Sequence, residues 1–126
     1  MNVCDRELLE LAAKAVGYST NHSWNRSRLE LDPPVMGLVV HDLEGELITT
    51  GWNPLDHNGD ALRLAVDMKI DIFPWISSAE GGATQARNHQ GTRTQERSSD
   101  NSGCIYSATR RAIVRAAAEI GRAAND

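Results

Sequence analysis

Aromatic residues are scarce in this chain. They make up 5% of its 126 residues, with a single Phe and three Trp. A core of stacked aromatic rings is therefore excluded, and the interior has to rest on Leu, Ile, Val and Ala, with the Trp rings as local packing points. A chain of this length suits one hydrophobic core, so we expect residues 1–126 to form a single domain.

Cysteine and long apolar runs are also lacking. The two thiols, Cys4 and Cys104, are too few for a zinc ligand set or a disulfide framework, and we expect them to be reduced. No apolar run approaches the roughly 20 residues that span a bilayer. The N-terminal sequence MNVCDRELLELAAK is charged and amphipathic, unlike a signal peptide. The sequence therefore predicts a cytoplasmic protein that does not associate with a membrane.

An excess of positive charge is missing as well. Thirteen Lys and Arg residues stand against 17 Asp and Glu, which gives a formal net charge of −4 and a pI near 5.5. Proteins that bind duplex nucleic acid through its phosphates need a basic face, so we do not expect a duplex as a partner. A small anionic ligand remains compatible with this charge, because a few local arginines can bind it.

The residues that are present predict alternating helices and hairpins. An amphipathic helix is expected over Arg6–Val16, with Asp5 as its N-cap and Gly17 after its end. Residues 35–41 and 46–52 resemble the two strands of a β-hairpin. The Ala-rich residues 108–123 predict a last helix.

The most distinctive stretch is residues 51–71, GWNPLDHNGDALRLAVDMKID. Pro54 ends the preceding strand, and Asn58 or Asp60 can cap a helix over residues 60–68. A strand at 70–76 follows. The face of this helix that we expect to be buried consists of Ala61, Leu62, Ala65 and Met68. The polar side chains of Asn53 and Arg63 have no part in this structural scheme, and we take them as candidate ligand contacts.

Residues 77–103 contain almost no apolar side chains and allow two interpretations. They could form a flexible loop, or a polar hairpin of residues 83–89 and 92–98 that turns at Gln90-Gly91. We favour the hairpin, because long structureless loops are uncommon in compact domains. The predicted fold class is α+β, with a small antiparallel sheet of about four to five strands packed with three helices.

Catalytic and metal-binding patterns are weak. Asp56, Asn58, Asp60 and Asp67 imitate an EF-hand loop, but Ala61 stands where that loop needs Gly. The four histidines show no metal-binding spacing, and no nucleophile motif occurs. We therefore expect no metal, no cofactor and no catalytic residues.

Arginines recur in the second half of the chain. Arg87 and Arg93 belong to the polar hairpin, and Arg110 and Arg111 follow Thr109 at the start of the last helix. Helix N-termini and guanidinium groups both bind phosphate, so these five residues form a candidate anion site. The alternative is that each arginine is a solvated charge that balances the many acidic residues.

A ligand that contains a base would also need an aromatic surface. Each of the three tryptophans could stack on a base or serve as a packing residue in the core. We expect Trp52 to be a core residue. Trp24 lies in a polar segment beside Asn25, Arg26 and Arg28, and is the preferred stacking residue.

Two motifs suggest a relative. The sequences WNPL at 52–55 and GDALRLAV at 59–66, together with ATRRAIVRAAA at 108–118, resemble short phage and prophage proteins similar to the NinX-like family. With the first helix, the resemblance covers roughly half of the chain and leaves residues 77–103 unmatched. The family has no assigned chemistry, so the resemblance implies a phage origin and location in the host cytoplasm.

Small phage proteins include several that counter host defence, among them oligomeric proteins that sequester nucleotide immune signals. The resemblance and the arginines together lead us to expect a homo-oligomeric protein that sequesters a cyclic nucleotide or cyclic ADP-ribose type of signal without converting it. One alternative is a module that binds and inhibits a host protein. A second is a hydrolase of such nucleotides, with His57 or His89 as the base.

Overall fold

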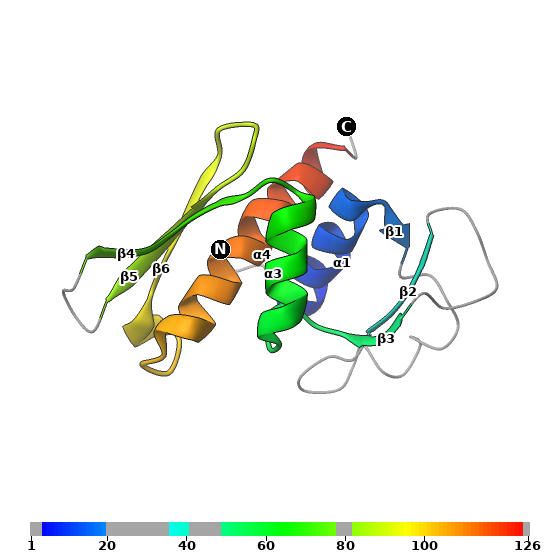
Figure 1. Ribbon diagram of the computed structural model, residues 1–126. Coiled ribbons are helices and arrows are strands. Elements are labelled where there is room, and N and C mark those ends of the chain that lie inside the picture. Colours follow the sequence, from blue (N-terminus) through cyan, green and yellow to red (C-terminus); the bar gives the residue numbers. More distant parts are fainter. Residues whose placement is uncertain (1–3, 20–35, 41–48, 78–81, 125–126) are drawn as a thin grey trace.

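A computed structural model describes residues 4–19, 36–40, 49–77 and 82–124 (Figure 1). Three α-helices, six strands and a short 3-10 helix, η2, occur in these ranges. In chain order they are α1 (Asp5–Val16), β1 (Tyr18–Ser19), β2 (Met36–Val40), β3 (Thr49–Trp52), α3 (Asn58–Asp67), β4 (Asp71–Ser77), β5 (Ala83–Arg87), β6 (Arg93–Arg97), η2 (Ser98–Asp100) and α4 (Ile105–Ala123).

The described strands form two separate antiparallel sheets. Within each sheet the strands lie side by side in the order in which they occur in the chain. One contains β1, β2 and β3, and the other contains β4, β5 and β6. Figure 1 shows them on opposite sides of the helices. The mixed α+β class and the three helices are confirmed, but each sheet has three strands, fewer than the four or five that we predicted. The described strands do not share one sheet because α3 carries the chain over α4 before β4 begins.

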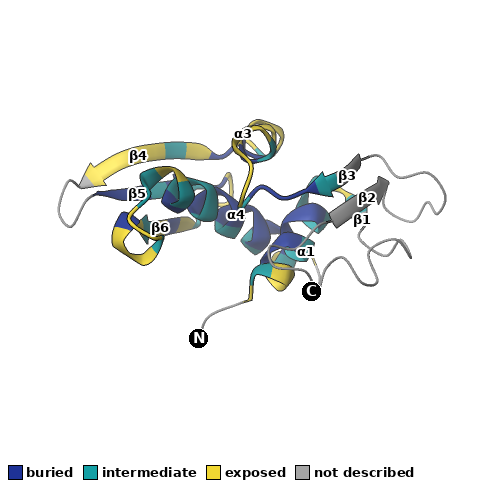
Figure 2. Cartoon of the chain, turned by 90° about the horizontal axis from the view of Figure 1, so that it is seen from below, coloured by how far each residue is buried: buried dark blue, intermediate teal, exposed yellow. Residues whose placement is uncertain are grey.

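The core is organised around α4, which packs against α1, α3 and all three strands of the second sheet. Its buried side chains are mostly small, and Figure 2 shows the helix enclosed by the other elements. Gly121 lies so close to α1 that a Cβ atom there would be 2.0 Å from the carbonyl oxygen of Leu11. Small residues on α4 therefore allow a close approach between the two helices.

The polar segment after β4 contains a hairpin, the alternative that we favoured. Strands β5 and β6 pair in register from Ala83 opposite Arg97 to Arg87 opposite Arg93. The hairpin buries the polar side chains of Thr84, Asn88 and Thr94 beside the apolar Ala83 and Ala86, and two of the polar ones donate hydrogen bonds to the backbone of α4. The Thr94 hydroxyl lies 2.6 Å from the Ala112 carbonyl oxygen, and the Asn88 amide lies 2.9 Å from that of Ala116.

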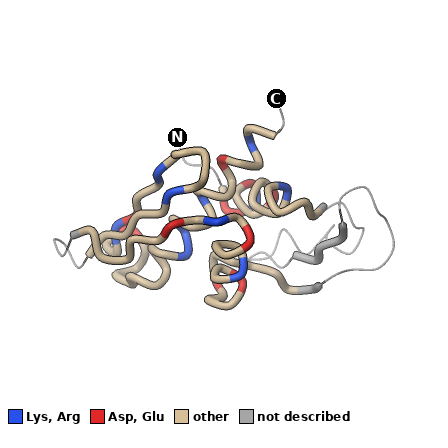
Figure 3. Tube along the Cα trace, turned by 45° about the horizontal axis from the view of Figure 1, so that its top comes forward, with Lys and Arg blue, Asp and Glu red and all other residues tan. Residues whose placement is uncertain are grey.

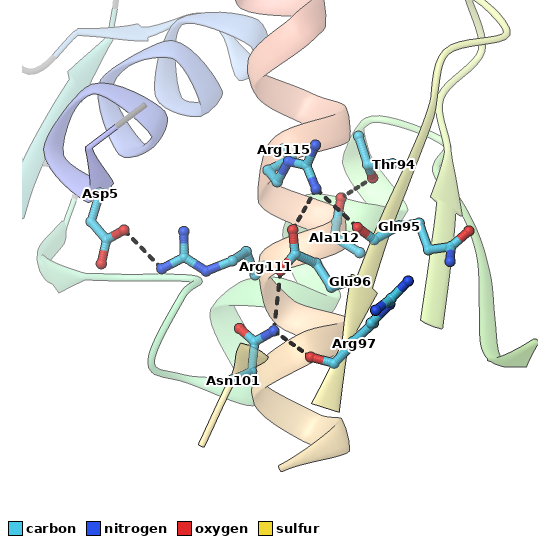
Figure 4. A network of polar contacts seen from close by, with 9 residues as sticks. All are labelled: Asp5, Thr94, Gln95, Glu96, Arg97, Asn101, Arg111, Ala112 and Arg115. Atoms are coloured by element: carbon cyan, nitrogen blue, oxygen red, sulfur yellow. Dashed lines mark hydrogen bonds and ion pairs between the residues drawn. The ribbon is translucent and has the colours of Figure 1, made fainter. Parts of the chain in front are cut away.

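Further polar contacts hold the outer edge of the hairpin (Figure 4). The guanidinium group of Arg115 donates to the Gln95 carbonyl oxygen and to the Glu96 carboxylate. The Asn101 amide donates to Glu96 and to the carbonyl oxygen of Arg97. Hydrogen bonds to α4 thus add to the burial of two small apolar side chains, Ala83 and Ala86.

The helix ends differ in part from the sequence-based expectation. Gly17 ends α1 in the left-handed conformation at φ 90°, as predicted, and its N–H donates to the Lys14 carbonyl oxygen. Asp5 lies inside the first turn of α1, and Cys4 holds the N-cap position. Likewise, α3 begins at Asn58, after His57 as N-cap, because Asp60 makes contacts outside the helix.

One buried position of α3 was predicted incorrectly. Leu62 is 61% exposed, whereas Leu64 is 2% exposed and packs in the core with Ala61 and Ala65. Residues 61, 64 and 65 follow the i, i+3, i+4 spacing of a single helix face, and Leu62 lies one residue further around the helix. Within the described ranges, no helix is long and apolar enough to cross a membrane.

Candidate functional site

A tight turn links β3 to α3, and its hydrogen bonds account for the polar side chains of Asn53 and Arg63. The Asn53 side-chain oxygen accepts the Leu55 N–H at 3.0 Å, and the Asn53 N–H donates to the Asp60 carboxylate at 3.0 Å. The other carboxylate oxygen of Asp60 accepts a hydrogen bond from Arg63 at 2.8 Å. Asn53 is 3% exposed. Asn53 and Arg63, the two candidate ligand-binding residues of this stretch, therefore both take part in hydrogen bonds that stabilise the turn and the start of α3.

Arg110 connects this turn to α4. Its Nε donates to the Leu55 carbonyl oxygen at 2.8 Å, its Nη1 to the Asn58 side-chain oxygen at 2.7 Å, and its Nη2 to the Ser107 hydroxyl at 2.9 Å. A guanidinium group carries five N–H bonds, and these contacts use three of them. Arg110 holds the start of α3 against the start of α4 and retains N–H bonds for a ligand.

A polar cavity of about 340 Å³ lies beside Arg110, where α1, the β3–α3 turn and the start of α4 meet. Arg111 also lines it and donates to the Asp5 carboxylate at 2.8 Å. The lining residues, mostly polar or charged, are Asp5, Asn53, Leu55, Asp56, Asp100, Asn101, Ser102, Ser107, Arg110 and Arg111. Three carboxylates thus stand against two guanidinium groups. This balance disfavours a polyphosphate in the cavity, because carboxylates repel it.

A second concavity of about 300 Å³ is mainly apolar and lies between α3, β4 and the start of α4. We call it the aromatic groove. Its walls are formed by Asn58, Ala61, Leu62, Ile72, Pro74, Trp75, Ile105, Tyr106, Thr109, Arg110 and Ile113. Trp75 is 61% exposed and Tyr106 is 68% exposed, so both rings have solvent-facing surface. Arg110 and Thr109 supply polar groups to the same walls.

The position of Trp75 depends on an irregularity in β4. The pairing with β5 is regular from Asp71 to Phe73 and shifts between Phe73 and Ser77. Such irregularities change the direction in which side chains point. The indole ring lies against Gly82, where an added Cβ would be 2.4 Å from the ring. Because Gly82 has no side chain, the indole ring can occupy this space.

The structure divides the predicted anion site. Thr109 and Arg110 line the aromatic groove, and Asn53, Arg110 and Arg111 line the polar cavity. The Thr109 hydroxyl also bonds to the Ile105 carbonyl oxygen and to Thr84. Trp24 lies outside the described residues. Sequence reasoning missed Tyr106 and treated Trp75 only as one of three possible stacking residues.

Arg87 and Arg93 lie away from the start of α4, opposite each other near the turn of the hairpin. Arg87 donates to the Asp71 carboxylate at 2.7 Å and lies 5.6 Å from the centre of the Phe73 ring. Arg93 is exposed. Figure 3 shows basic and acidic residues interspersed along the described chain. The four arginines of the predicted site therefore belong to two separate regions.

Cys104 holds the N-cap position of α4 and is half-buried. The backbone N–H and the hydroxyl of Ser107 lower the pKa of its thiol, with smaller contributions from the Tyr106 backbone and from the charge of Arg110. Partial desolvation opposes the shift. The thiolate form is thus favoured at this helix start relative to an ordinary cysteine.

The proposed bases of the hydrolase alternative lie next to residues that contact different positions of α4. His57 precedes α3, whose Asn58 contacts Arg110. His89 follows Asn88, which is bonded to the Ala116 carbonyl oxygen further along α4. No group of three or more His, Cys, Asp or Glu side chains within the described segments is placed to hold a metal ion.

Comparisons of the chain with protein family models, curated proteins and solved structures found no match. The resemblance to the NinX-like family therefore stays a prediction from the quoted motifs. The aromatic groove and the polar cavity are the two concave surfaces among the described residues that bear on function.

Proposed function

We propose that this protein binds and sequesters a small nucleotide-derived ligand in the aromatic groove, without converting it. The supporting observation is that Trp75 and Tyr106, two largely exposed aromatic residues, line the same 300 Å³ groove as Arg110. A base can stack on either ring, and the guanidinium group can bind a phosphate. A phage-encoded protein that removes a host immune signal would have this chemistry.

The shape of the groove fits this class of ligand. Its volume is at the lower end of the roughly 300–1,000 Å³ typical of small-molecule sites. Ile72, Ile105 and Ile113 supply apolar lining, while Asn58, Thr109 and Arg110 offer polar groups. A ligand with an aromatic part and an anionic part would match both regions.

The test is calorimetric titration with a panel of cyclic dinucleotides, cyclic ADP-ribose isomers, ADP-ribose and mononucleotides. Ligand that is recovered intact after heat denaturation of the complex supports sequestration, and chemically altered ligand identifies an enzyme instead. Failure of every member of the panel to bind would contradict the proposal. The corresponding neutral nucleoside should bind more weakly than its nucleotide, and added salt should reduce this difference because it screens the charge of Arg110.

The matched variants are Trp75→Ala and Phe73→Ala. Stacking on an aromatic side chain contributes about 1–3 kcal/mol per base, so Trp75→Ala should weaken binding roughly 5- to 150-fold. Phe73 is exposed two residues before Trp75 in β4, where its ring contacts Arg87 and is not part of the groove. Phe73→Ala should therefore bind like the wild type. Equal affinities of the two variants would remove the groove as the site.

A host protein is the second candidate partner. The exposed apolar side chains of α3 and β4 favour it, because contiguous apolar surface is typical of protein interfaces. An inhibitor of this type would bind a purified host protein in the absence of any nucleotide. Competition between that protein and a bound nucleotide would place both on the groove.

A further inference from the structure

Arg110 forms the boundary between the two concave surfaces, because it lines both the aromatic groove and the polar cavity. Its Nη1 donates to Asn58, which lines the groove, and its Nε and Nη2 donate to Leu55 and Ser107, which line the cavity. Among the described residues that line the groove, Arg110 is the only one with a charged side chain. The charge of a ligand in the groove is therefore balanced at a single point.

The hydrogen bonds of Arg110 leave donors for two acceptor atoms. Its Nε has one hydrogen, which the Leu55 carbonyl oxygen accepts. Nη1 and Nη2 each have two, and each uses one of them for a described residue, so one N–H remains on each nitrogen. A phosphodiester has two oxygen atoms without an ester bond, and these share one negative charge. The remaining donors therefore match one phosphodiester group.

The carboxylates of the polar cavity oppose a second anionic group. Asp5 is paired with Arg111 at 2.8 Å, whereas Asp56 and Asp100 are exposed. Of the described residues, only His57 lies within ion-pair distance of these two carboxylates, 3.9 Å from Asp56, and it carries a charge only when protonated. A ligand bound to Arg110 lies next to this cavity. Each additional negative charge on the ligand is therefore repelled.

The size of the groove favours a ligand with one base. Its volume of about 300 Å³ is at the lower end of the range for small-molecule sites. A base that stacks on Trp75 or Tyr106, with its sugar and a phosphate at Arg110, would occupy the groove. A second nucleotide would extend beyond the walls, into solvent or past Arg110 toward the carboxylates.

We infer that the ligand of the aromatic groove belongs to the cyclic mononucleotides, which have one base and one phosphodiester group. Asp56 and Asp100 determine this specificity through their charge and disfavour ligands with a second negative charge. Cyclic dinucleotides, ADP-ribose and nucleotide monoesters carry about two charges at neutral pH and are bound more weakly. The inference rests on the proposed function, because it narrows the ligand class of the same groove.

Calorimetric titration with sets of ligands that share a base tests the inference. The adenine set consists of adenosine, cyclic AMP, AMP, ADP-ribose and cyclic di-AMP, and the other three bases are compared in the same way. In the set that binds most tightly, we expect the cyclic mononucleotide to bind roughly tenfold more tightly than the dianionic members. The titrations are made well below 0.1 M salt, where exposed charges interact over more than about 10 Å.

Asp56→Asn and Asp100→Asn are the variants that test the role of charge, since each removes one negative charge with little change in the size of the side chain. Each should reduce the preference for the cyclic mononucleotide over the dianionic ligands roughly threefold, and the double variant should nearly abolish it. Asp67→Asn is the matched control. It removes the same charge from an exposed position of α3 that lines neither concave surface, and the wild-type preference should persist.

The outcomes separate this inference from the proposed function. Dianionic ligands that bind as tightly as the cyclic mononucleotide, or more tightly, would overturn the inference and leave nucleotide sequestration in place. A preference that persists unchanged in the double variant would also overturn it, because the two carboxylates would then have no part in specificity. If no member of any set binds, the inference and the proposed function both fail. Thermal melting without ligand establishes that each variant is folded.

Discussion

The close approach of α1 and α4 makes the effect of Gly121→Ala a direct test of the structure. Helix propensity alone predicts that this change stabilises the protein, by about 1 kcal/mol, because Gly is unfavourable inside a helix. The structure leads to the opposite expectation. A Cβ atom at position 121 would be 2.0 Å from the Leu11 carbonyl oxygen and 2.8 Å from its carbonyl carbon. These are backbone atoms, so no side-chain rotation can relieve the contact.

The size of the effect follows from the distance. A normal contact needs about 3.4 Å, so α1 and α4 have to separate locally by more than 1 Å, and their small facing side chains lose part of their packing. Overpacking of this kind costs about 1–3 kcal/mol and more where the backbone has to move. The gain in helix propensity offsets part of this cost. We therefore expect the free energy of unfolding to fall by about 2 kcal/mol. At about 4 °C per kcal/mol for a chain of this size, Tm should fall by about 8 °C.

Urea denaturation with Gly59→Ala as the control makes this measurement decisive. Gly59 lies in the first turn of α3, and a Cβ atom there would meet only the flexible guanidinium group of Arg63, at 3.4 Å or more. Gly59→Ala should therefore be neutral or slightly stabilising. If Gly121→Ala is as stable as Gly59→Ala or more stable than the wild type, the described packing of α1 on α4 is wrong.

Four further outcomes are expected. Thr94→Val should lower the free energy of unfolding by about 1 kcal/mol, because it removes the buried hydrogen bond to Ala112 without changing the size of the side chain; equal urea midpoints would contradict this. Asn88→Ala should lower it by more, about 1–3 kcal/mol, since it also leaves the Gln90 and Thr92 N–H groups of the turn without their acceptor, as the same titration would show. Because its pKa is lowered, the Cys104 thiol should react with iodoacetamide at neutral pH faster than a free cysteine derivative; the exposed Cys4 is first replaced by Ser, and adding Cys104→Ser should then abolish the reaction. The shift also means that stability gained through the thiolate is present above the ordinary thiol pKa and is lost as the pH falls through the lowered pKa, which melting of wild type and variant at several pH values would reveal.

The sequence predicted the elements of the fold better than their arrangement. The helix of residues 6–16 and its Gly17 end follow from local periodicity and backbone preference, and the structure has both. Periodicity also located α3 and α4 to within a few residues of their ends. The division into two sheets depends on how α3 crosses α4, which is a long-range property that no local pattern contains.

The candidate site was less accessible to prediction for a similar reason. Arginine content pointed to an anion site, but the partners of each arginine come from distant segments. Arg110 binds the carbonyl oxygen of Leu55 and Arg111 binds Asp5, and neither contact has a sequence signal. Trp75 joins the groove through a pairing shift in β4 and the space above Gly82.

The two hydrogen bonds from the hairpin to α4 have a mechanical consequence. An interface of interchangeable apolar side chains can slide in small steps, because every intermediate position still buries similar surface. Asn88 and Thr94 instead donate to the Ala116 and Ala112 carbonyl oxygens, which lie one helical turn apart. A displacement by less than a turn would leave both donors buried and unbonded, so only one position of the hairpin along α4 is stable. Detachment should consequently occur in a single step, with the backbone amides of β5 and β6 exchanging their hydrogens together.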